Sequence, residues 1–152
     1  MAVAVARRVV CNDIIWKDPC AIMAAGWLAE TFGLQVLVLT RHPAAFVDSY
    51  LRVDWGFRYA ELLRQPTLME RYLEGFRRPL EQASVAALDR VDHAILLWRL
   101  FHHVIADHQD HLPDAIVVRH EDLAHDPQRQ FSALYPALGL RMTDRIAERI
   151  RS

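Results

Sequence analysis

Hydrophobic residues along this chain follow two different spacings, and the changes between them separate predicted strands from predicted helices. Residues 7–16 are rich in Val and Ile and predict a first strand. Residues 34–40 form an almost continuous apolar run, which is typical of a parallel strand covered on both faces. A third strand is predicted over residues 115–120. Strands separated by longer helical segments indicate an α/β fold with a parallel sheet flanked by helices.

The segments between these strands have helical spacing and carry residues that suit helix ends. Asp18 suits the N-cap of a first helix, and Gly33 suits its end. A second helix is expected over residues 43–53, and a later one between Asp126 and Gly139.

The longest stretch of helical spacing covers residues 84–109. Its apolar residues recur at steps of three, four or seven, which predicts one buried face. The residues of that face are Leu88, Val91, Ile95, Trp98 and Ile105. Trp27 is assigned to the buried stripe of the first helix in the same way, and a last helix is expected from about Thr143.

Length and composition fit one globular domain that covers residues 1–152. Hydrophobic residues make up 53% of the chain and the formal net charge is −1, so no overall field favours a nucleic acid. No apolar run reaches the roughly 18 residues that a membrane span needs, and we expect a cytoplasmic protein. Cys11 and Cys20 have no metal-binding spacing and are expected as reduced thiols in or near the core.

Charged residues follow each predicted strand. In open α/β sheets, ligands bind beyond the carboxyl ends of the strands, so these positions are candidates for a binding site. They are Lys17 with Asp18, Arg41 with His42, and Arg119 with His120.

Arg41 stands where the second predicted strand gives way to a helix. A guanidinium beside the unpaired N–H groups of a helix start forms an anion site, and Ser49, two helical turns later, is a candidate second donor to a phosphate. The alternative from spacing alone is a surface arginine paired with a carboxylate and a serine that faces solvent.

Three segments carry a family resemblance. "VLVLTRHPAAFVDSY" contains a strand, an Arg, a Pro two residues on, and a Ser eight residues after the Arg. "IIWKDP" precedes it and "AIVVRHEDLAHDPQRQFSALYPALGL" follows it. In this order they resemble the 3′-phosphate-binding, Lys-x-Pro and Tyr-Glu-Asp-Leu segments of the sulfotransferase family, and of its bacterial members in particular. The resemblance covers roughly residues 9–142.

The resemblance implies a P-loop NTPase-like sulfotransferase fold. It also implies transfer of a sulfuryl group from 3′-phosphoadenosine 5′-phosphosulfate (PAPS) to a hydroxyl of a carbohydrate or small molecule. By this likeness Arg41 and Ser49 hold the 3′-phosphate of the cofactor. Lys17 stands near the transferring group as a catalytic residue, because a cation there offsets developing charge. His120 occupies the place of the family's Tyr, which lies against the adenine.

One part of the family pattern has no counterpart here. Sulfotransferases begin with a glycine-containing loop that cradles the 5′-phosphosulfate, because small residues let backbone N–H groups approach the oxygens. The five glycines form no such cluster; they are Gly26, Gly33, Gly56, Gly75 and Gly139. We therefore expect an N-terminally incomplete sulfotransferase-like domain that is inactive alone. No general base is identified, because Asp18 suits a helix N-cap better.

Four histidines lie with acidic residues near the end of the long predicted helix. They are His102, His103, His108 and His111. Histidines and charges belong there on the solvent-facing side, where they favour the helix dipole, so no metal site is expected.

Two further groups have a structural alternative to a functional role. Glu121 and Asp122 are expected to hold backbone and basic groups at the exit of the third strand. Trp55, Phe57 and Tyr59 either shape an acceptor pocket or pack a helical subdomain onto the sheet.

Two other functions stand beside sulfuryl transfer. A non-catalytic remnant would bind an adenosine 3′,5′-bisphosphate-like ligand or a partner chain, which is either a second copy or a chain that complements the missing segment. A P-loop kinase relative that acts on a nucleotide is the third. Binding of adenosine 3′,5′-bisphosphate to the wild type and to Arg41→Ala separates a ligand binder from an inert scaffold.

Overall fold

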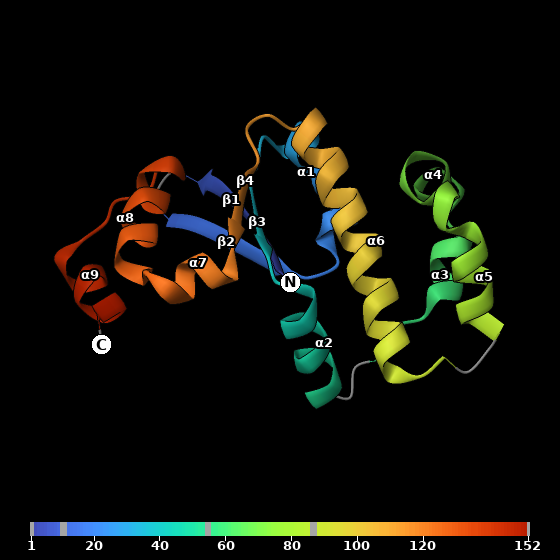
Figure 1. Cartoon of the computed structure of the whole chain (residues 1–152). Helices are drawn as coiled ribbons and strands as arrows, with labels where there is room; N and C mark the ends of the chain where they lie inside the picture. Colours follow the sequence, from blue (N-terminus) through green and yellow to red (C-terminus); the bar gives the residue numbers. More distant parts are fainter. Residues whose placement is uncertain (1, 10–11, 54–55, 86–87, 152) are drawn as a thin grey trace.

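The computed structural model describes residues 2–9, 12–53, 56–85 and 88–151, with side chains from Ile15 onward (Figure 1). Most of these residues are helical, and a small sheet makes the chain loosely α/β. The elements in chain order are β1 (Ala2–Val9), β2 (Asn12–Asp18), η1 (Ala21–Ala24), α1 (Ala25–Phe32), β3 (Gln35–Thr40), α2 (Pro43–Arg52), α3 (Tyr59–Leu63), α4 (Pro66–Leu68), η2 (Met69–Leu73), η3 (Glu74–Phe76), α5 (Arg77–Val85), α6 (Arg90–His111), β4 (Ile116–Arg119), α7 (His120–His125), α8 (Pro127–Ala137) and α9 (Asp144–Arg151). η1 and η3 are 3-10 turns, and η2 is a π-helical turn.

The described strands form a mixed sheet in the order β2-β1-β3-β4. β3 and β4 are parallel, with Thr40 opposite Arg119, whereas β1 is antiparallel to both β2 and β3. The single strand expected over residues 7–16 is wrong, because β1 and β2 form an antiparallel pair with Val9 opposite Asn12. The expected parallel sheet is confirmed for β3 and β4 but not for β1, which is antiparallel to both of its neighbours. Val and Ile content predicts a strand but does not determine the direction in which it pairs.

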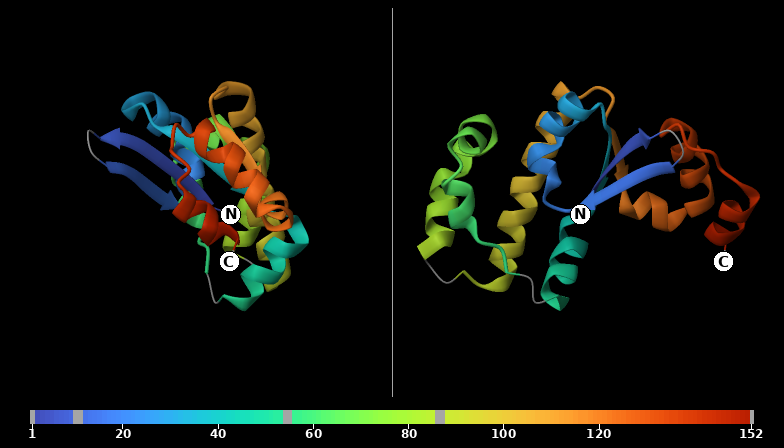
Figure 2. Two further views of the ribbon diagram at one scale, coloured as in Figure 1. Left: turned by 90° about the vertical axis from the view of Figure 1, so that its left-hand side faces the viewer. Right: turned by 180° about the vertical axis from the view of Figure 1, so that it is seen from behind.

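Helices lie on both sides of the parallel strands. α1 and α6 lie on one side of β3 and β4, and α7, α8 and α9 lie on the other (Figures 1 and 2). α6 separates the strands from an outer group formed by α3, α4 and α5. α2 continues beyond β3 and packs against α6.

Several helix ends confirm the capping residues expected from the sequence. Asp18 fulfils its expected N-cap role only in part: its Oδ1 accepts a hydrogen bond from the Cys20 N–H (2.7 Å), but Asp18 ends β2 and the N-cap of η1 is Cys20. Gly33 ends α1 with φ 61°, a conformation that glycine adopts without a steric penalty. Asp126 Oδ1 accepts from the Arg129 N–H (3.1 Å) at the start of α8. Local signals of this kind predict element ends well.

The long helix is shorter than expected. It begins at Arg90 and not at residue 84, because Asp89 caps it and accepts a hydrogen bond from the Asp92 N–H (2.8 Å). The preceding residues up to Val85 belong to α5.

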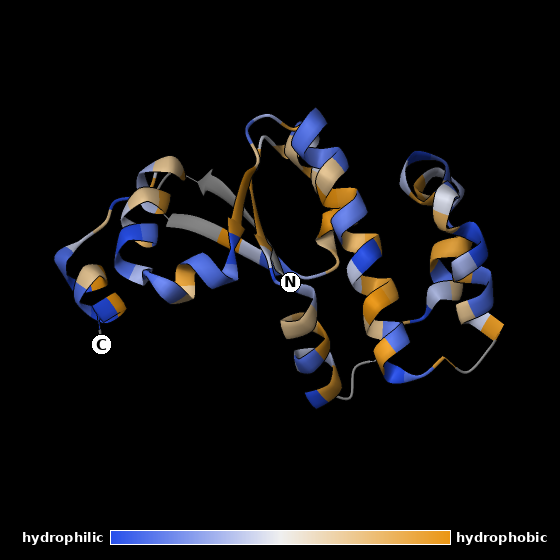
Figure 3. Ribbon diagram, viewed as in Figure 1, coloured by the Kyte–Doolittle hydropathy of each residue, from blue (hydrophilic) through white to orange (hydrophobic). Residues whose placement is uncertain are grey.

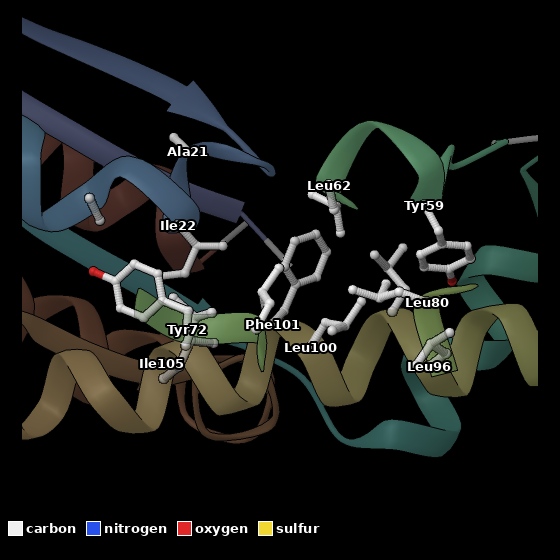
Figure 4. Packing of buried hydrophobic residues seen from close by; sticks show 14 of the residues in the cluster. Ala21, Ile22, Tyr59, Leu62, Tyr72, Leu80, Leu96, Leu100, Phe101 and Ile105 are labelled. Atoms are coloured by element: carbon white, nitrogen blue, oxygen red, sulfur yellow. The ribbon is translucent and has the colours of Figure 1, made fainter. Parts of the chain in front are cut away.

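The core lies between α6 and the segments packed on it (Figure 4). Its largest fully buried side chains are Tyr59, Phe101, Ile22, Met69, Leu73, Leu80, Leu97, Leu100, Val38 and Val104. The expected apolar face of α6 is wrong in its first half, because Val91 and Ile95 are 41% and 43% exposed. The buried face begins instead at Ala94, roughly 100° around the helix from Ile95. Trp27 and Cys20 are also exposed and not buried as expected.

Aromatic residues just before and at the start of α3 pack the outer helices onto α6. The Phe57 ring lies 6.3 Å from the Phe101 ring, and Tyr59 is 2% exposed. Tyr59 also donates a hydrogen bond to the His93 carbonyl (2.8 Å). These contacts favour the alternative in which Phe57 and Tyr59 pack the helical subdomain, and not the one in which they shape a pocket for an acceptor substrate. Trp55 lies outside the described residues.

Hydropathy follows this packing. Hydrophobic residues cover β3 and β4 and recur along α6 (Figure 3). On β2 the adjacent Ile15 and Trp16 are 62% and 47% exposed. None of the described helices has both the length and the apolar content needed to cross a bilayer.

Candidate functional site

The carboxyl ends of three strands point to one edge of the sheet. β1 is antiparallel to β2 and β3, and β3 is parallel to β4, so β2, β3 and β4 run in the same direction. Arg41 directly follows β3, Arg119 is the last residue of the adjacent β4, and both line one cavity at this edge. The sequence-based expectation of a site beyond the strand ends therefore agrees with the topology for two of the three positions.

The cavity has a volume of about 520 Å³, within the usual range for a small-ligand site. It lies between the β3–α2 junction, α6 and the end of β4. Its lining residues are Thr40, Arg41, His42, Pro43, Trp98, His102, Ile105, Ala106, Gln109, Val117, Arg119 and Glu121. Two guanidinium groups among these side chains suit an anionic ligand.

The backbone of Arg41 is anchored, whereas its guanidinium is not. Trp98 Nε1 donates a hydrogen bond to the Arg41 carbonyl oxygen (2.9 Å). Arg41 Nε is buried and has no hydrogen-bond partner among the described residues, nor does any described carboxylate form an ion pair with Arg41. A buried N–H without an acceptor costs roughly 1–3 kcal/mol, so a ligand that brings an acceptor would relieve it.

The start of α2 offers fewer free N–H groups than the sequence suggested. The His42 N–H donates to Glu121 Oε1 (2.8 Å), and Pro43 has no N–H. The Ala44 N–H donates to His42 Nδ1 (3.3 Å). These two N–H groups are therefore not open to an anion, and the guanidinium groups are the cavity's main donors.

Glu121 has the structural role expected of it. Its hydrogen bond from the His42 N–H ties α7 to the β3–α2 junction. The same bond favours the ionised carboxylate and holds the pKa of Glu121 below its ordinary value.

Trp98 and His102 form an aromatic wall of the cavity that our sequence analysis missed. Their rings are stacked, with centroids 3.7 Å apart and planes 21° apart. His102 Nδ1 lies 2.9 Å from the Trp98 carbonyl oxygen. Burial disfavours the charged ring and lowers the pKa of His102. The spacing of four residues on one helix was the available signal, since such residues share a face.

Three predicted site residues do not line this cavity: Ser49, Lys17 and His120. Ser49 is half-buried on α2, and His120 is exposed at the first position of α7. Lys17 is exposed on β2, which lies beyond β1 and therefore roughly 10 Å across the sheet from β3. The structure thus brings Arg41 together with Arg119 and not with the other predicted residues.

His108 is buried and not solvent-facing as expected. It is 2% exposed, its Nε2 lies 2.8 Å from the Ile22 carbonyl oxygen, and its ring is edge-on to Tyr72. His111 contacts the Asp107 carbonyl oxygen (2.8 Å) on the same helix. Within the described part of the chain, no three His, Cys, Asp or Glu side chains are grouped so that they could hold a metal ion.

A second cavity of about 620 Å³ lies between α1 and residues 64–72. Exposed Trp27 lines it, as does Arg71, whose Cζ lies 5.1 Å from the Tyr72 ring centroid. It contains none of the residues predicted for a site.

Comparison of the chain with family models, with curated proteins and with solved structures finds no match. The function is therefore argued from the chemistry of the strand-end cavity. Its guanidinium groups can bind phosphate or sulfate oxygens, and its imidazole wall can contact the body of an anionic ligand.

Proposed function

We propose that the cavity beside Arg41 binds the 3′-phosphate end of PAPS or of adenosine 3′,5′-bisphosphate, within a sulfotransferase-like domain. The observation that carries the proposal is the buried, unpartnered Nε of Arg41 in a cavity that also contains Arg119. The segment around Arg41 is the one that resembles the family's 3′-phosphate-binding segment, which selects this anion among others.

The residues present fit one end of the nucleotide. Arg41 and Arg119 supply charge-assisted hydrogen bonds to phosphate oxygens, and Ser49 and His120 enter through the family resemblance alone. The bound PAPS supplies the sulfuryl group, and a carbohydrate or small-molecule hydroxyl is the proposed acceptor. Lys17 keeps its proposed role near the transferring sulfuryl group. Because β1 lies between Lys17 and the cavity of Arg41, we propose that this chain alone binds the nucleotide but does not transfer the sulfuryl group.

Calorimetric titration with adenosine 3′,5′-bisphosphate tests the proposal. We expect Arg41→Gln to weaken binding about 10- to 100-fold, because a hydrogen bond to a charged group contributes roughly 1.5–3 kcal/mol. Arg119→Gln should weaken binding as well. Adenosine 5′-monophosphate, which lacks the 3′-phosphate, should bind weakly to all forms.

Arg52→Gln is the matched control. Arg52 lies on α2 but is exposed and pairs with Asp48 (2.6 Å), so its loss should leave the affinity unchanged. Thermal melts of each variant establish that it is folded. Equal dissociation constants for the wild type and Arg41→Gln would overturn the proposal.

A further inference from the structure

The imidazole of His102 is held in a fixed position beside Arg41. Trp98 connects the two residues: its Nε1 donates to the Arg41 carbonyl oxygen (2.9 Å), and its indole stacks on the His102 ring. His102 and Arg41 both line the strand-end cavity. A ligand held by the Arg41 guanidinium therefore lies in the same cavity as this imidazole.

The hydrogen bond of His102 determines which ring nitrogen carries the proton. Nδ1 lies 2.9 Å from the Trp98 carbonyl oxygen, and a carbonyl only accepts hydrogen bonds. Nδ1 must therefore donate, which leaves a lone pair on Nε2 in the neutral ring. Nε2 has no hydrogen-bond partner in the described part of the chain. Burial lowers the pKa of His102 and so favours this neutral form.

Thr40, Gln109 and Glu121 also line the cavity with oxygens that can accept a hydrogen bond, and His102 differs from them because its ring is stacked on Trp98. Arg41 and Arg119 only donate. His42 Nδ1 accepts from the Ala44 N–H, and Glu121 Oε1 accepts from the His42 N–H. Nε2 of His102 is an acceptor without a hydrogen bond to any described residue, on a ring that lines the same cavity as Arg41 and Arg119.

We propose that His102 Nε2 accepts a hydrogen bond from a hydroxyl next to the bound phosphate, which in a nucleoside 3′-phosphate is the ribose 2′-hydroxyl. The inference rests on 3′-phosphate binding at Arg41. The 2′-hydroxyl is carried by the carbon adjacent to the phosphorylated one, so it is the ribose donor nearest to that phosphate. His102 then makes the site selective for ribonucleotides over deoxyribonucleotides.

Binding of adenosine 3′,5′-bisphosphate and of its 2′-deoxy analogue tests this inference. We expect the wild type to bind the ribose form about 2- to 10-fold more tightly, which is the usual worth of one neutral hydrogen bond. His102→Phe keeps a ring that stacks on Trp98 but has no acceptor, and it should bind both ligands with the affinity that the wild type shows for the deoxy form. His102→Gln restores an acceptor and should recover part of the preference.

His103→Phe is the matched control. His103 is the next residue on α6, does not line the cavity, and contacts the Phe76 ring (5.2 Å). It should keep the ribose preference of the wild type. Equal affinities of the wild type for the two ligands, or a preference unchanged in His102→Phe, would overturn the role of His102 and leave phosphate binding intact. Binding of neither ligand would overturn both proposals.

Discussion

The side chains around Arg41 hold its backbone and leave its guanidinium available. Trp98 on α6 binds the Arg41 carbonyl, and Glu121 on α7 binds the next N–H along the chain. Two helices on opposite sides of the sheet therefore meet at one strand end. These contacts to backbone atoms position Arg41, and neither of them involves its guanidinium group.

Acidification tests the role of His102. Its pKa is lowered by burial, so the ring is neutral at neutral pH and gains a proton on Nε2 only below its ordinary range. We expect the preference for ribose to be present at about pH 7.5 and to fall only once the pH drops below the ordinary imidazole pKa of about 6.5, because a protonated Nε2 cannot accept. The ratio of the two dissociation constants is the measurement.

Other charged groups around His102 also respond to pH. Arg41 and His42 face the cavity from the β3–α2 junction, Arg119 from β4 and Glu121 from α7. Their effects, and the titration of the phosphate, act on both ligands and cancel in the ratio. A ratio that stays constant in the wild type after the His102 ring has gained its proton, as followed by NMR of that ring, would contradict the prediction.

At the residue scale, sequence reasoning found the cation but not its surroundings. Arg41 was predicted because the sequence itself shows a charged residue directly after an apolar strand. Trp98 was assigned to a core stripe, and its contact with the Arg41 carbonyl joins residues 57 positions apart. Nothing in the spacing of α6 shows which element lies opposite, so the aromatic wall could not be predicted.

Elements were predicted best where a local signal ends them. Gly33 marks a boundary through its backbone angle and Asp126 through one hydrogen bond, and both were found from sequence. The hairpin of β1 and β2 was missed, because pairing direction depends on the partner strand and not on composition. The buried side of α6 was also misplaced, because α2, η1 and η2 all pack against it.

Two glycines of the first helix should respond to alanine in opposite directions. At Gly26 a new Cβ would meet its nearest neighbour, His108 Cε1, at 3.6 Å, which is ordinary contact. Gly26→Ala should therefore stabilise the protein by about 0.5–1 kcal/mol through better helix propensity. At Gly33 the φ of 61° disfavours a Cβ, and Gly33→Ala should destabilise by about 1–2 kcal/mol.

Denaturant unfolding of the wild type and both variants measures these differences. Gly139→Ala, at φ 67°, serves as a second left-handed position and should behave like Gly33→Ala. Destabilisation by Gly26→Ala would show that α1 packs more tightly against α6 than described here.

At the scale of the whole molecule, the antiparallel β1 separates the predicted catalytic residue from the strand-end cavity beside Arg41. β2, which carries Lys17, and β3, which precedes Arg41, run in the same direction. They are not adjacent in the sheet, because β1 lies between them. The predicted mixture of strands and helices agrees with the structure, whereas the spatial order of the strands was not available from the sequence.

This separation bears on turnover. We expect the purified chain, given PAPS with carbohydrate and phenolic acceptors, to form no adenosine 3′,5′-bisphosphate above the buffer control, because Lys17 does not line the cavity of Arg41. Chromatography of the nucleotide products is the measurement. Product formation that scales with protein concentration and disappears in Arg41→Gln would contradict the expectation.

The pairing of Ala2 with Leu39 has a practical consequence for labelling the protein. Because β1 runs against β3, its first residue lies at the strand end that leads into Arg41 (Figure 1). An affinity tag or fluorophore fused ahead of Ala2 would emerge near the Arg41 end of β3 and would interfere with the proposed nucleotide binding there. A fusion placed after α9, at the far side of the molecule, leaves that strand end clear.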